Sequence, residues 1–219
     1  MEIIRMENVS VTVKEETKDK LIFSDLSLSV DKGEKVLIKG RSGIGKTTVF
    51  RLILGFIRPS TGDIYFEGKK VDPALFWDIR KRIAHISQDS DIGEGPVMTL
   101  FEEVFSYGAN KDKFSRADLN ALLSEFSLQE NILAKKFENL SGGEKQRIAI
   151  IISLMTKKDI FFLDEITSDL DVALKEKVVD FFLSHPEWTV LAISHDPEWE
   201  REGVRVIDFT EMVSVKKVD

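Results

Sequence analysis

The sequence predicts an α/β fold in which helices cover a sheet built around parallel strands. Two observations indicate this class. Residues 35–39 and 159–163 contain short, nearly continuous apolar runs, which are typical of strands covered by helices on both faces. Each run leads into a polar turn and then into a segment whose apolar residues have helical spacing. We therefore assign the core to the α/β class.

An antiparallel β part is expected at the N-terminal end. Apolar residues recur at about every second position in residues 3–13 and again in residues 26–30, which indicates two half-buried strands. The charged residues 14–20 between them form the predicted hairpin loop. Residues 31–34 form a turn into the first buried strand.

The next elements alternate between helix and strand. Residues 48–56 have helical spacing, and Pro-Ser-Thr-Gly at residues 59–62 is expected to end that helix. A strand at residues 64–66, a helix at residues 73–81 and a strand at residues 83–87 are predicted to follow.

Helical spacing then dominates residues 89–157, which begin with an acidic, glycine-containing loop. We predict three helices there, at residues 99–107, 115–126 and 141–156. This stretch is interpreted as a helical subdomain inserted into the core.

The core resumes near residue 158. After the second buried strand we predict a helix at residues 171–183, followed by three strands at residues 189–193, 204–209 and 212–215. The prediction is thus one domain over residues 1–219. Its α/β core has a mixed sheet and an antiparallel β part, formed by residues 1–88 and 158–219.

Composition excludes several classes of protein. The chain has 219 residues and a formal net charge of −7, so it lacks the cationic excess that broad nucleic-acid binding requires. It contains no cysteine, which excludes disulfides and thiolate metal sites. We expect no secretory leader and no membrane span, because no apolar run approaches about 18 residues.

The glycine-rich residues 40–48 carry the strongest chemical signal. They match G-x-x-x-x-G-K-[ST] between a strand and a helix, the context in which this pattern forms a phosphate-binding P-loop. Backbone N–H groups and the positive end of the following helix would face the phosphates. Lys46 would reach the β- and γ-phosphates, and the Thr47 hydroxyl would bind Mg²⁺. The predicted nucleotide-binding residues are Gly40, Arg41, Ser42, Gly43, Ile44, Gly45, Lys46, Thr47 and Thr48.

Two carboxylates follow the second buried strand. Asp164 and Glu165 stand at its C-terminal end, where open α/β sheets bind their ligands. We expect Asp164 to hold Mg²⁺ and Glu165 to act as general base on the attacking water.

A third element, Leu-Ser-Gly-Gly-Glu-Lys-Gln-Arg at residues 140–147, carries no catalytic side chain. Ser141 can cap a helix, and Glu144 three residues later completes a capping box. Gly142 and Gly143 would let bare N–H groups approach an anion.

These elements together resemble the ATP-binding-cassette (ABC) ATPases over essentially the whole chain. The residues that carry the resemblance, in order and approximate spacing, are residues 40–48, Gln88, residues 140–147, residues 160–165, residues 168–171 and His195. The motif at residues 140–147 is the most specific of them.

The resemblance implies a role for each motif. Residues 40–48 resemble the Walker A loop, and Asp164 with Glu165 the end of Walker B. Gln88 is similar to the glutamine that senses the γ-phosphate and Mg²⁺. His195 is similar to the histidine that contacts the γ-phosphate.

The resemblance also implies a homodimer that closes on ATP binding. Ser141, Gly142 and Gly143 would contact the ATP held by the other copy, and residues 168–171 would cross the interface. The position that matches the family's adenine-stacking aromatic residue is Val13, which offers no ring. Residues 130–147 and 163–171 resemble a subgroup of exporter ATPases associated with iron efflux.

The leading hypothesis is an ATP-hydrolysing subunit that drives a separate membrane permease from the cytoplasmic face of the cell membrane. Residues 97–105 are the expected permease-docking surface, through exposed apolar side chains. An alternative is a soluble ABC ATPase such as an iron–sulfur cluster assembly ATPase. A single-site nucleotide kinase would leave residues 140–147 unexplained.

Overall fold

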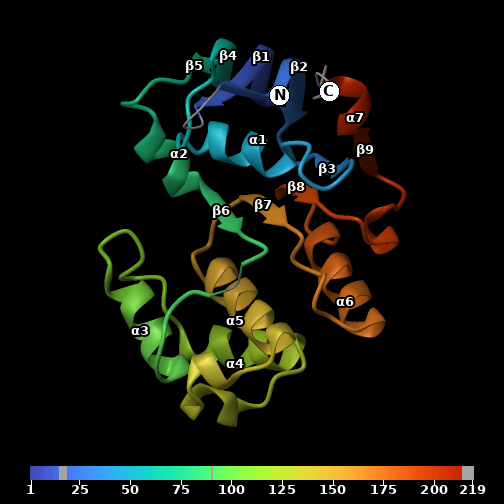
Figure 1. Cartoon of the computed structure of the whole chain (residues 1–219). Coiled ribbons are helices and arrows are strands. Elements are labelled where there is room, and N and C mark those ends of the chain that lie inside the picture. Colours follow the sequence, from blue (N-terminus) through green and yellow to red (C-terminus); the bar gives the residue numbers. More distant parts are fainter. Residues whose placement is uncertain (15–18, 90, 214–219) are drawn as a thin grey trace.

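The computed structural model describes residues 1–14, 19–89 and 91–213. It confirms the α/β class and contains two sheets rather than one mixed sheet (Figure 1). The larger sheet has five strands in the order β6-β7-β8-β3-β9, and every pair in it is parallel. The smaller has four antiparallel strands in the order β2-β1-β4-β5. The expectation of a mixed core sheet was therefore wrong in this detail.

The antiparallel sheet is organised by one long strand. β1 (Glu2–Lys14) pairs with β2 (Asp19–Asp31) on one side and with β4 (Thr61–Phe66) on the other, and β5 (Lys69–Lys70) extends the edge. Because β1 has a partner on both sides, this sheet is complete without any strand of the parallel core.

The parallel sheet contains the strands β3 (Lys35–Lys39), β6 (Ile83–Ile86), β7 (Ile160–Asp164), β8 (Thr189–Ile193) and β9 (Val204–Asp208). Its two faces belong to different apolar cores. Phe161 and Leu163 of β7 pack with the helices that follow β6, whereas Ile160 and Phe162 pack toward α1 and the antiparallel sheet. Strands buried on both faces explain the continuous apolar runs in the sequence.

The helices fall into layers (Figure 1). α1 (Lys46–Ile53) lies between the two sheets, and α2 (Phe76–Arg82) leads into β6. α3 (Val97–Ser106), α4 (Arg116–Glu125) and α5 (Gly142–Met155) lie beyond the other face of the parallel sheet. α6 (Val172–Leu183) joins β7 to β8, and α7 (Phe209–Met212) follows β9. Single 3₁₀ turns occupy Glu130–Ala134, Phe137–Asn139 and Pro197–Trp199.

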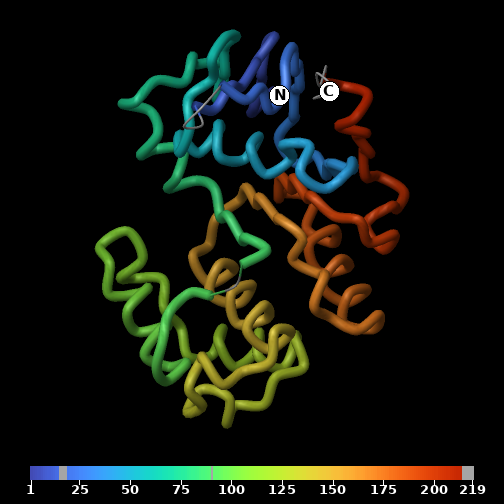
Figure 2. The backbone as a smooth tube through the Cα atoms, viewed as in Figure 1, coloured from blue at the N-terminus to red at the C-terminus, as the bar shows by residue number. Residues whose placement is uncertain are grey.

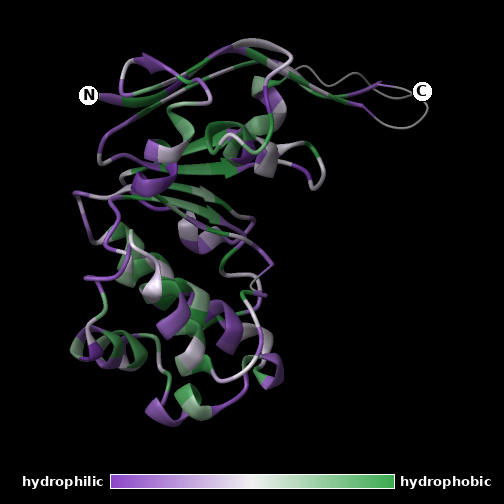
Figure 3. Ribbon diagram, turned by 90° about the vertical axis from the view of Figure 1, so that its left-hand side faces the viewer, coloured by the Kyte–Doolittle hydropathy of each residue, from purple (hydrophilic) through white to green (hydrophobic). Residues whose placement is uncertain are grey.

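The course of the backbone shows how the helical stretch is placed. In Figure 2 the chain leaves the core after β6, forms α3, α4 and α5, and returns to the core at β7. The turned view in Figure 3 shows the hydrophobic strands stacked in the middle of the molecule, with α5 beneath them. The boundaries drawn at residues 88 and 158 stay a prediction.

Three predicted segments differ from the structure. Met212 belongs to α7 and not to a strand, because the Asp208 carboxylate accepts a hydrogen bond from the Thr210 N–H and starts a helix; residues 214–215 lie outside the described residues. Thr61 and Gly62 belong to β4 rather than to a turn. The predicted loop at residues 14–20 is shortened at both ends, because β1 reaches Lys14 and β2 starts at Asp19. Residues 15–18 lie outside the described residues.

The helix α3 corrects the expected docking surface. Val97, Leu100, Phe101 and Phe105 are 0–5% exposed and belong to the core of the helical stretch. An apolar stripe at helical spacing faces the core rather than a partner. Residues 97–105 therefore do not present the exposed apolar face that the sequence suggested.

Arg147 joins the start of α5 to the end of α4. Its guanidinium donates to the backbone carbonyls of Phe126 (2.9 Å), Ser127 (3.1 Å) and Gly143 (3.0 Å). Carbonyls at a helix C-terminus lack intrahelical partners, so this side chain satisfies groups that would otherwise be left open.

We predict that Arg147→Met lowers the free energy of unfolding by about 1.5–3 kcal/mol, because it keeps the apolar stem and removes charged donors from half-buried carbonyls. The matched control is Arg116→Met, which removes an exposed ion pair with Glu130 and is expected to cost less than about 1 kcal/mol. The midpoint of urea unfolding measures both variants. Equal shifts in the two midpoints would contradict the prediction.

Candidate functional site

The glycine loop is held by a central strand. β3 pairs in parallel with β8 and with β9, so it has a neighbour on both sides. Its C-terminal end therefore lies at the edge formed by the carboxyl ends of the strands, where open α/β sheets bind ligands. Gly45 precedes α1 with a φ of 108°, and a Cβ there would lie 2.8 Å from Cγ2 of Ile22. Only glycine combines that backbone with so close a neighbour. The loop is thus fixed against β2.

Lys46 lies inside this loop. Its ammonium donates to the carbonyls of Gly40 (2.6 Å) and Arg41 (3.1 Å), and its side chain is buried. Burial lowers the pKa of Lys46, while the nearby charges of Glu165 and Asp164 act in the opposite direction. The lysine remains a cation aimed at the loop interior.

Thr47 and Asp164 come from different elements and touch. The Thr47 hydroxyl, at the start of α1, donates to the carboxylate of Asp164 at the end of β7, over 2.7 Å. Asp164 is 4% exposed. A hydroxyl and one buried carboxylate are oxygen ligands of the kind that Mg²⁺ prefers.

Among the described residues, no group of three or more histidine, aspartate or glutamate side chains could hold a metal alone. The Thr47 hydroxyl and the Asp164 carboxylate fit Mg²⁺, which protein sites hold through one or two carboxylates together with substrate phosphates. The donor set present therefore suits this ion.

Glu165 has an unusual backbone. Its φ is 53°, in the left-handed region that residues other than glycine seldom adopt, and its N–H donates to the carbonyl of Ile193 (2.9 Å). The carboxylate is 16% exposed, and burial raises the pKa of Glu165, against the opposing charges of His195 and Lys46. Such strained positions persist where the surroundings enforce them, which is common at active sites.

His195 completes the group. Its Nε2 lies 3.6 Å from the Glu165 carboxylate and 3.4 Å from the Lys46 ammonium, and its side chain is half exposed. It follows β8, so the C-terminal ends of three parallel strands supply the lysine, the glutamate and the histidine.

Lys46, Thr47, Asp164 and Glu165 line one pocket of about 270 Å³, and His195 contacts Lys46 and Glu165 without being part of the lining. The residues that line it are Ile22, Ser42, Gly43, Gly45, Lys46, Thr47, Thr48, Gln88, Asp164, Glu165 and Ile193. Most of the predicted phosphate, metal and catalytic residues are therefore brought together. Gln88 reaches the pocket from the segment after β6.

Five of the predicted phosphate, catalytic and adenine-side residues do not line this pocket, and His195 is one of them. Gly40 and Arg41 form the base of the loop, and Ile44 packs on the core between the sheets. Val13 is 43% exposed on β1 and does not line the pocket. Ile22 occupies the apolar side that Val13 was expected to supply.

Sequence reasoning missed Ile22 for a physical reason. The β1–β2 ladder contains register shifts around Val9, Val11 and Thr12, and such bulges change which side chain faces the loop. No sequence signal marks these shifts. Phe23 next to it is fully buried, as its pattern suggested.

The motif at residues 140–147 forms a second site. Ser141 accepts from the Glu144 N–H (3.2 Å), and Glu144 accepts from the Ser141 N–H (2.9 Å), which is a complete capping box. A Cβ on Gly142 would lie 2.9 Å from the Asp169 carboxylate, and one on Gly143 would lie 2.9 Å from the Asp169 carbonyl. The glycines therefore admit the segment that follows Glu165.

The two sites stay apart within one chain. The surface pocket at the start of α5, about 510 Å³, shares no lining residue with the nucleotide pocket. Its lining includes Ser141, Gly142, Gly143 and Asp169.

Comparisons with known proteins agree with this geometry. The family model described as ABC transporter matches residues 23–168. The energy-coupling factor transporter ATP-binding protein EcfA1 of Mycoplasma genitalium is 32% identical over 201 residues, covering 90% of this chain and 73% of that protein. The probable iron export ATP-binding protein FetA of Escherichia coli is 30% identical over 194 residues, with 86% and 84% covered.

A solved structure is similar along nearly the whole chain. The ATP-binding cassette MJ0796, in a dimeric post-hydrolysis state bound to ADP and Pi, has a TM-score of 0.80 and 25% identity, and 94% of each chain is covered. The family match, the identity to EcfA1 and the shared fold lead to one conclusion: this chain belongs to the ABC transporter family, as an ATP-binding and ATP-hydrolysing subunit.

Proposed function

We propose that two copies of this chain close around two ATP molecules, hydrolyse them with Mg²⁺ and thereby drive a membrane permease. The observation that carries the catalytic part is the contact group of Lys46, Glu165 and His195, with Glu165 3.6 Å and Lys46 3.4 Å from the same histidine nitrogen. A cation, a base and a proton-carrying ring at one sheet edge suit phosphoryl transfer to water.

Each residue has a proposed task. The N–H groups of residues 40–48 and the Lys46 ammonium bind the phosphates. Thr47, Asp164 and Gln88 would hold Mg²⁺, which neutralises charge on the phosphate oxygens when bound. Glu165 takes the proton of the attacking water, and His195 binds the γ-phosphate.

The separation of the two sites supports the dimer. Ser141, Gly142 and Gly143 form a capped helix start that lines a pocket sharing no residue with the nucleotide pocket of their own chain. We propose that they contact the γ-phosphate bound by the other copy. MJ0796 is a dimer in the similar structure.

The proposed partner is an integral-membrane permease, which this chain binds at the cytoplasmic face of the cell membrane. In the described part of the chain, no helix is long and apolar enough to cross a bilayer. EcfA1 and FetA are named as ATP-binding proteins of transport or export systems, so a soluble assembly ATPase is not favoured. The name of FetA suggests iron export, which we keep as the proposed subgroup.

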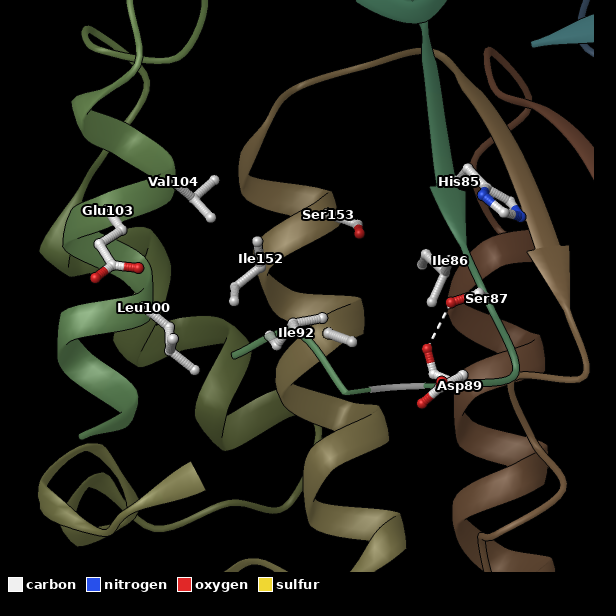
Figure 4. Close-up of a pocket in the computed structure, with 11 residues that line it drawn as sticks. His85, Ile86, Ser87, Asp89, Ile92, Leu100, Glu103, Val104, Ile152 and Ser153 are labelled. Carbon is white, nitrogen blue, oxygen red and sulfur yellow. Dashed lines mark hydrogen bonds between the residues drawn. The ribbon is translucent and has the colours of Figure 1, made fainter. Parts of the chain in front are cut away.

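We place the docking site in a pocket of about 140 Å³, to which residues 97–105 contribute only Leu100, Glu103 and Val104 (Figure 4). It lies between the end of β6 and the helices α3 and α5, where Ile92 and Val104 offer apolar surface beside Glu103. The segment after β6 also carries Gln88 to the nucleotide pocket, so a permease segment seated here would touch the same segment.

We predict that Glu165→Gln abolishes ATP hydrolysis and retains ATP binding. The amide cannot accept the proton from water but keeps the shape of the side chain, so hydrolysis should fall about 100-fold or more. Phosphate release and nucleotide binding measure the two effects, and size-exclusion chromatography with ATP should show a dimer.

The control for this variant is Glu202→Gln, which removes an exposed carboxylate far along the chain and should leave hydrolysis unchanged. Full hydrolysis by Glu165→Gln would refute the assigned base. A strictly monomeric ATP-saturated variant would refute the shared site.

The acid limb of kcat/KM for ATP hydrolysis should lie above pH 4.5, the ordinary pKa of a glutamate, because burial raises the pKa of Glu165 and only the deprotonated form accepts a proton. Activity is thus lost as the pH falls through the raised value. In His195→Asn, residual activity should show a limb at still higher pH, since a charge that lowers the Glu165 pKa is removed. A limb that stays in place would contradict this assignment.

Ile92→Glu should reduce transport by the complex with its permease and leave basal ATP hydrolysis intact, because a charge replaces apolar surface in the docking pocket. Val206→Glu is the matched control, since Val206 is 45% exposed and Ile92 42% exposed. Transport into vesicles measures both variants. Equal transport by the two would remove the docking site from this pocket.

A further inference from the structure

A further pocket, which is basic, lies at the opposite end of the parallel strands from the nucleotide pocket. Its volume is about 340 Å³, and it is lined by Trp77, Arg80, Lys81, Ala109, Asn110, Lys113 and Lys158. Four of these side chains are cationic, in a chain whose net charge is −7. It shares no lining residue with the nucleotide pocket.

The position of Lys158 fixes the distance between the two sites. Lys158 precedes β7, whereas Asp164 ends it, and a strand advances about 3.3 Å per residue. The two pockets therefore lie at opposite edges of the sheet, separated by the length of β7.

Two of the lysines that line the pocket bind backbone carbonyls. Lys113 donates to the Thr156 carbonyl (2.7 Å), and Lys158 donates to the carbonyls of Arg80 (2.9 Å) and Ile83 (2.8 Å). Within the described residues, neither lysine forms an ion pair. Burial, with a smaller contribution from the charge of Lys113, lowers the pKa of Lys158 to about 8.

The remaining cations are held at the rim by aromatic rings. Arg80 donates to the Leu54 carbonyl (2.8 Å) and lies over the ring of Phe56. Lys81 lies over Trp77 and is 3.5 Å from Asp78, an exposed carboxylate that the pocket lining does not include. The positive charge of the pocket is thus left largely uncompensated.

Trp77 gives the pocket an apolar wall. Its side chain is 63% exposed, so the indole is open to a ligand. An indole beside convergent cations matches the composition of small-ligand sites, which combine apolar walls with a few placed charges in about 300–1,000 Å³.

We propose that this pocket binds a carboxylate or phosphate group carried on an apolar body, with the anion between Lys113 and Lys158 and the apolar part against Trp77. The source of that anion is either a free small molecule or the headgroup of an anionic lipid. The anion supplies the counter-charge that neither ammonium group has among the described residues.

The test titrates the full-length protein with four probes: inorganic phosphate, benzoate, phenyl phosphate and short-chain dihexanoyl phosphatidate. A change of tryptophan fluorescence on adding a probe, if it is lost in Trp77→Phe, reports binding at this wall. We expect saturable binding, with phenyl phosphate tighter than inorganic phosphate. Preference for phosphatidate over phenyl phosphate assigns the lipid source, and the reverse order assigns a free small anion.

Lys113→Gln should weaken binding about tenfold or more, because it removes a charged hydrogen bond to the anion. The matched control is Lys111→Gln, an exposed lysine two residues away that does not line the pocket and should leave affinity within about twofold. Equal weakening by both variants would show diffuse attraction and overturn the site.

A measurement that needs no amino-acid substitution guards against a variant that fails to fold. NMR of dimethylated lysines should show the Lys158 resonance titrating near 8 in the free protein and at higher pH with phenyl phosphate bound. If no probe binds, or if only an acidic peptide of a membrane subunit does, the proposal is wrong. None of these readouts uses ATP, so failure here leaves the proposed ATPase function untouched.

Discussion

The contact between Thr47 and Asp164 is the constraint on which the site depends. It joins the first turn of α1 to the last residue of β7, two elements more than a hundred positions apart in the sequence, over 2.7 Å. The contact requires β3 and β7 to end at the same edge of the sheet, which parallel pairing through β8 ensures. It also requires the glycine loop to turn the chain back at once, which Gly45 permits. The contact therefore depends on both the sheet topology and the glycine loop.

Around this contact the charges restrain one another. Lys46 is buried against the loop carbonyls, Glu165 is buried beside it, and His195 lies within 3.6 Å of both. Burial lowers the pKa of Lys46 and raises the pKa of Glu165, and their mutual attraction opposes both shifts. The result is a base whose proton affinity is raised while a cation remains next to it, which is the balance that hydrolysis near neutral pH needs.

The sequence predicts those parts that local chemistry decides. The glycine loop, the acidic strand end and the capping box at Ser141 depend on residue type and short spacing, and all three stand where the sequence puts them. Ser115 and Asp171 likewise cap α4 and α6 at the expected boundaries.

What the sequence could not predict depends on pairing at long range. The strand order of the parallel sheet needed knowledge of which strands become neighbours, and the pocket side chain Ile22 needed the bulges of the β1–β2 ladder. The direction of α3 was misjudged because an apolar stripe is the same whether it meets a core or a partner. The short helix α7 was missed because one capping carboxylate outweighs a brief apolar pattern.

The packing of Asp169 on Gly142 and Gly143 has a consequence for cooperativity. Asp169 lies in the segment that starts at Glu165, so the backbone that bears the base also lies against the surface offered to the second copy. In the proposed dimer, bound triphosphate orders that segment. The ordered segment then favours nucleotide binding by the neighbouring protomer. Linkage then makes the effect reciprocal, so occupancy of one nucleotide pocket strengthens occupancy of the other by the same factor.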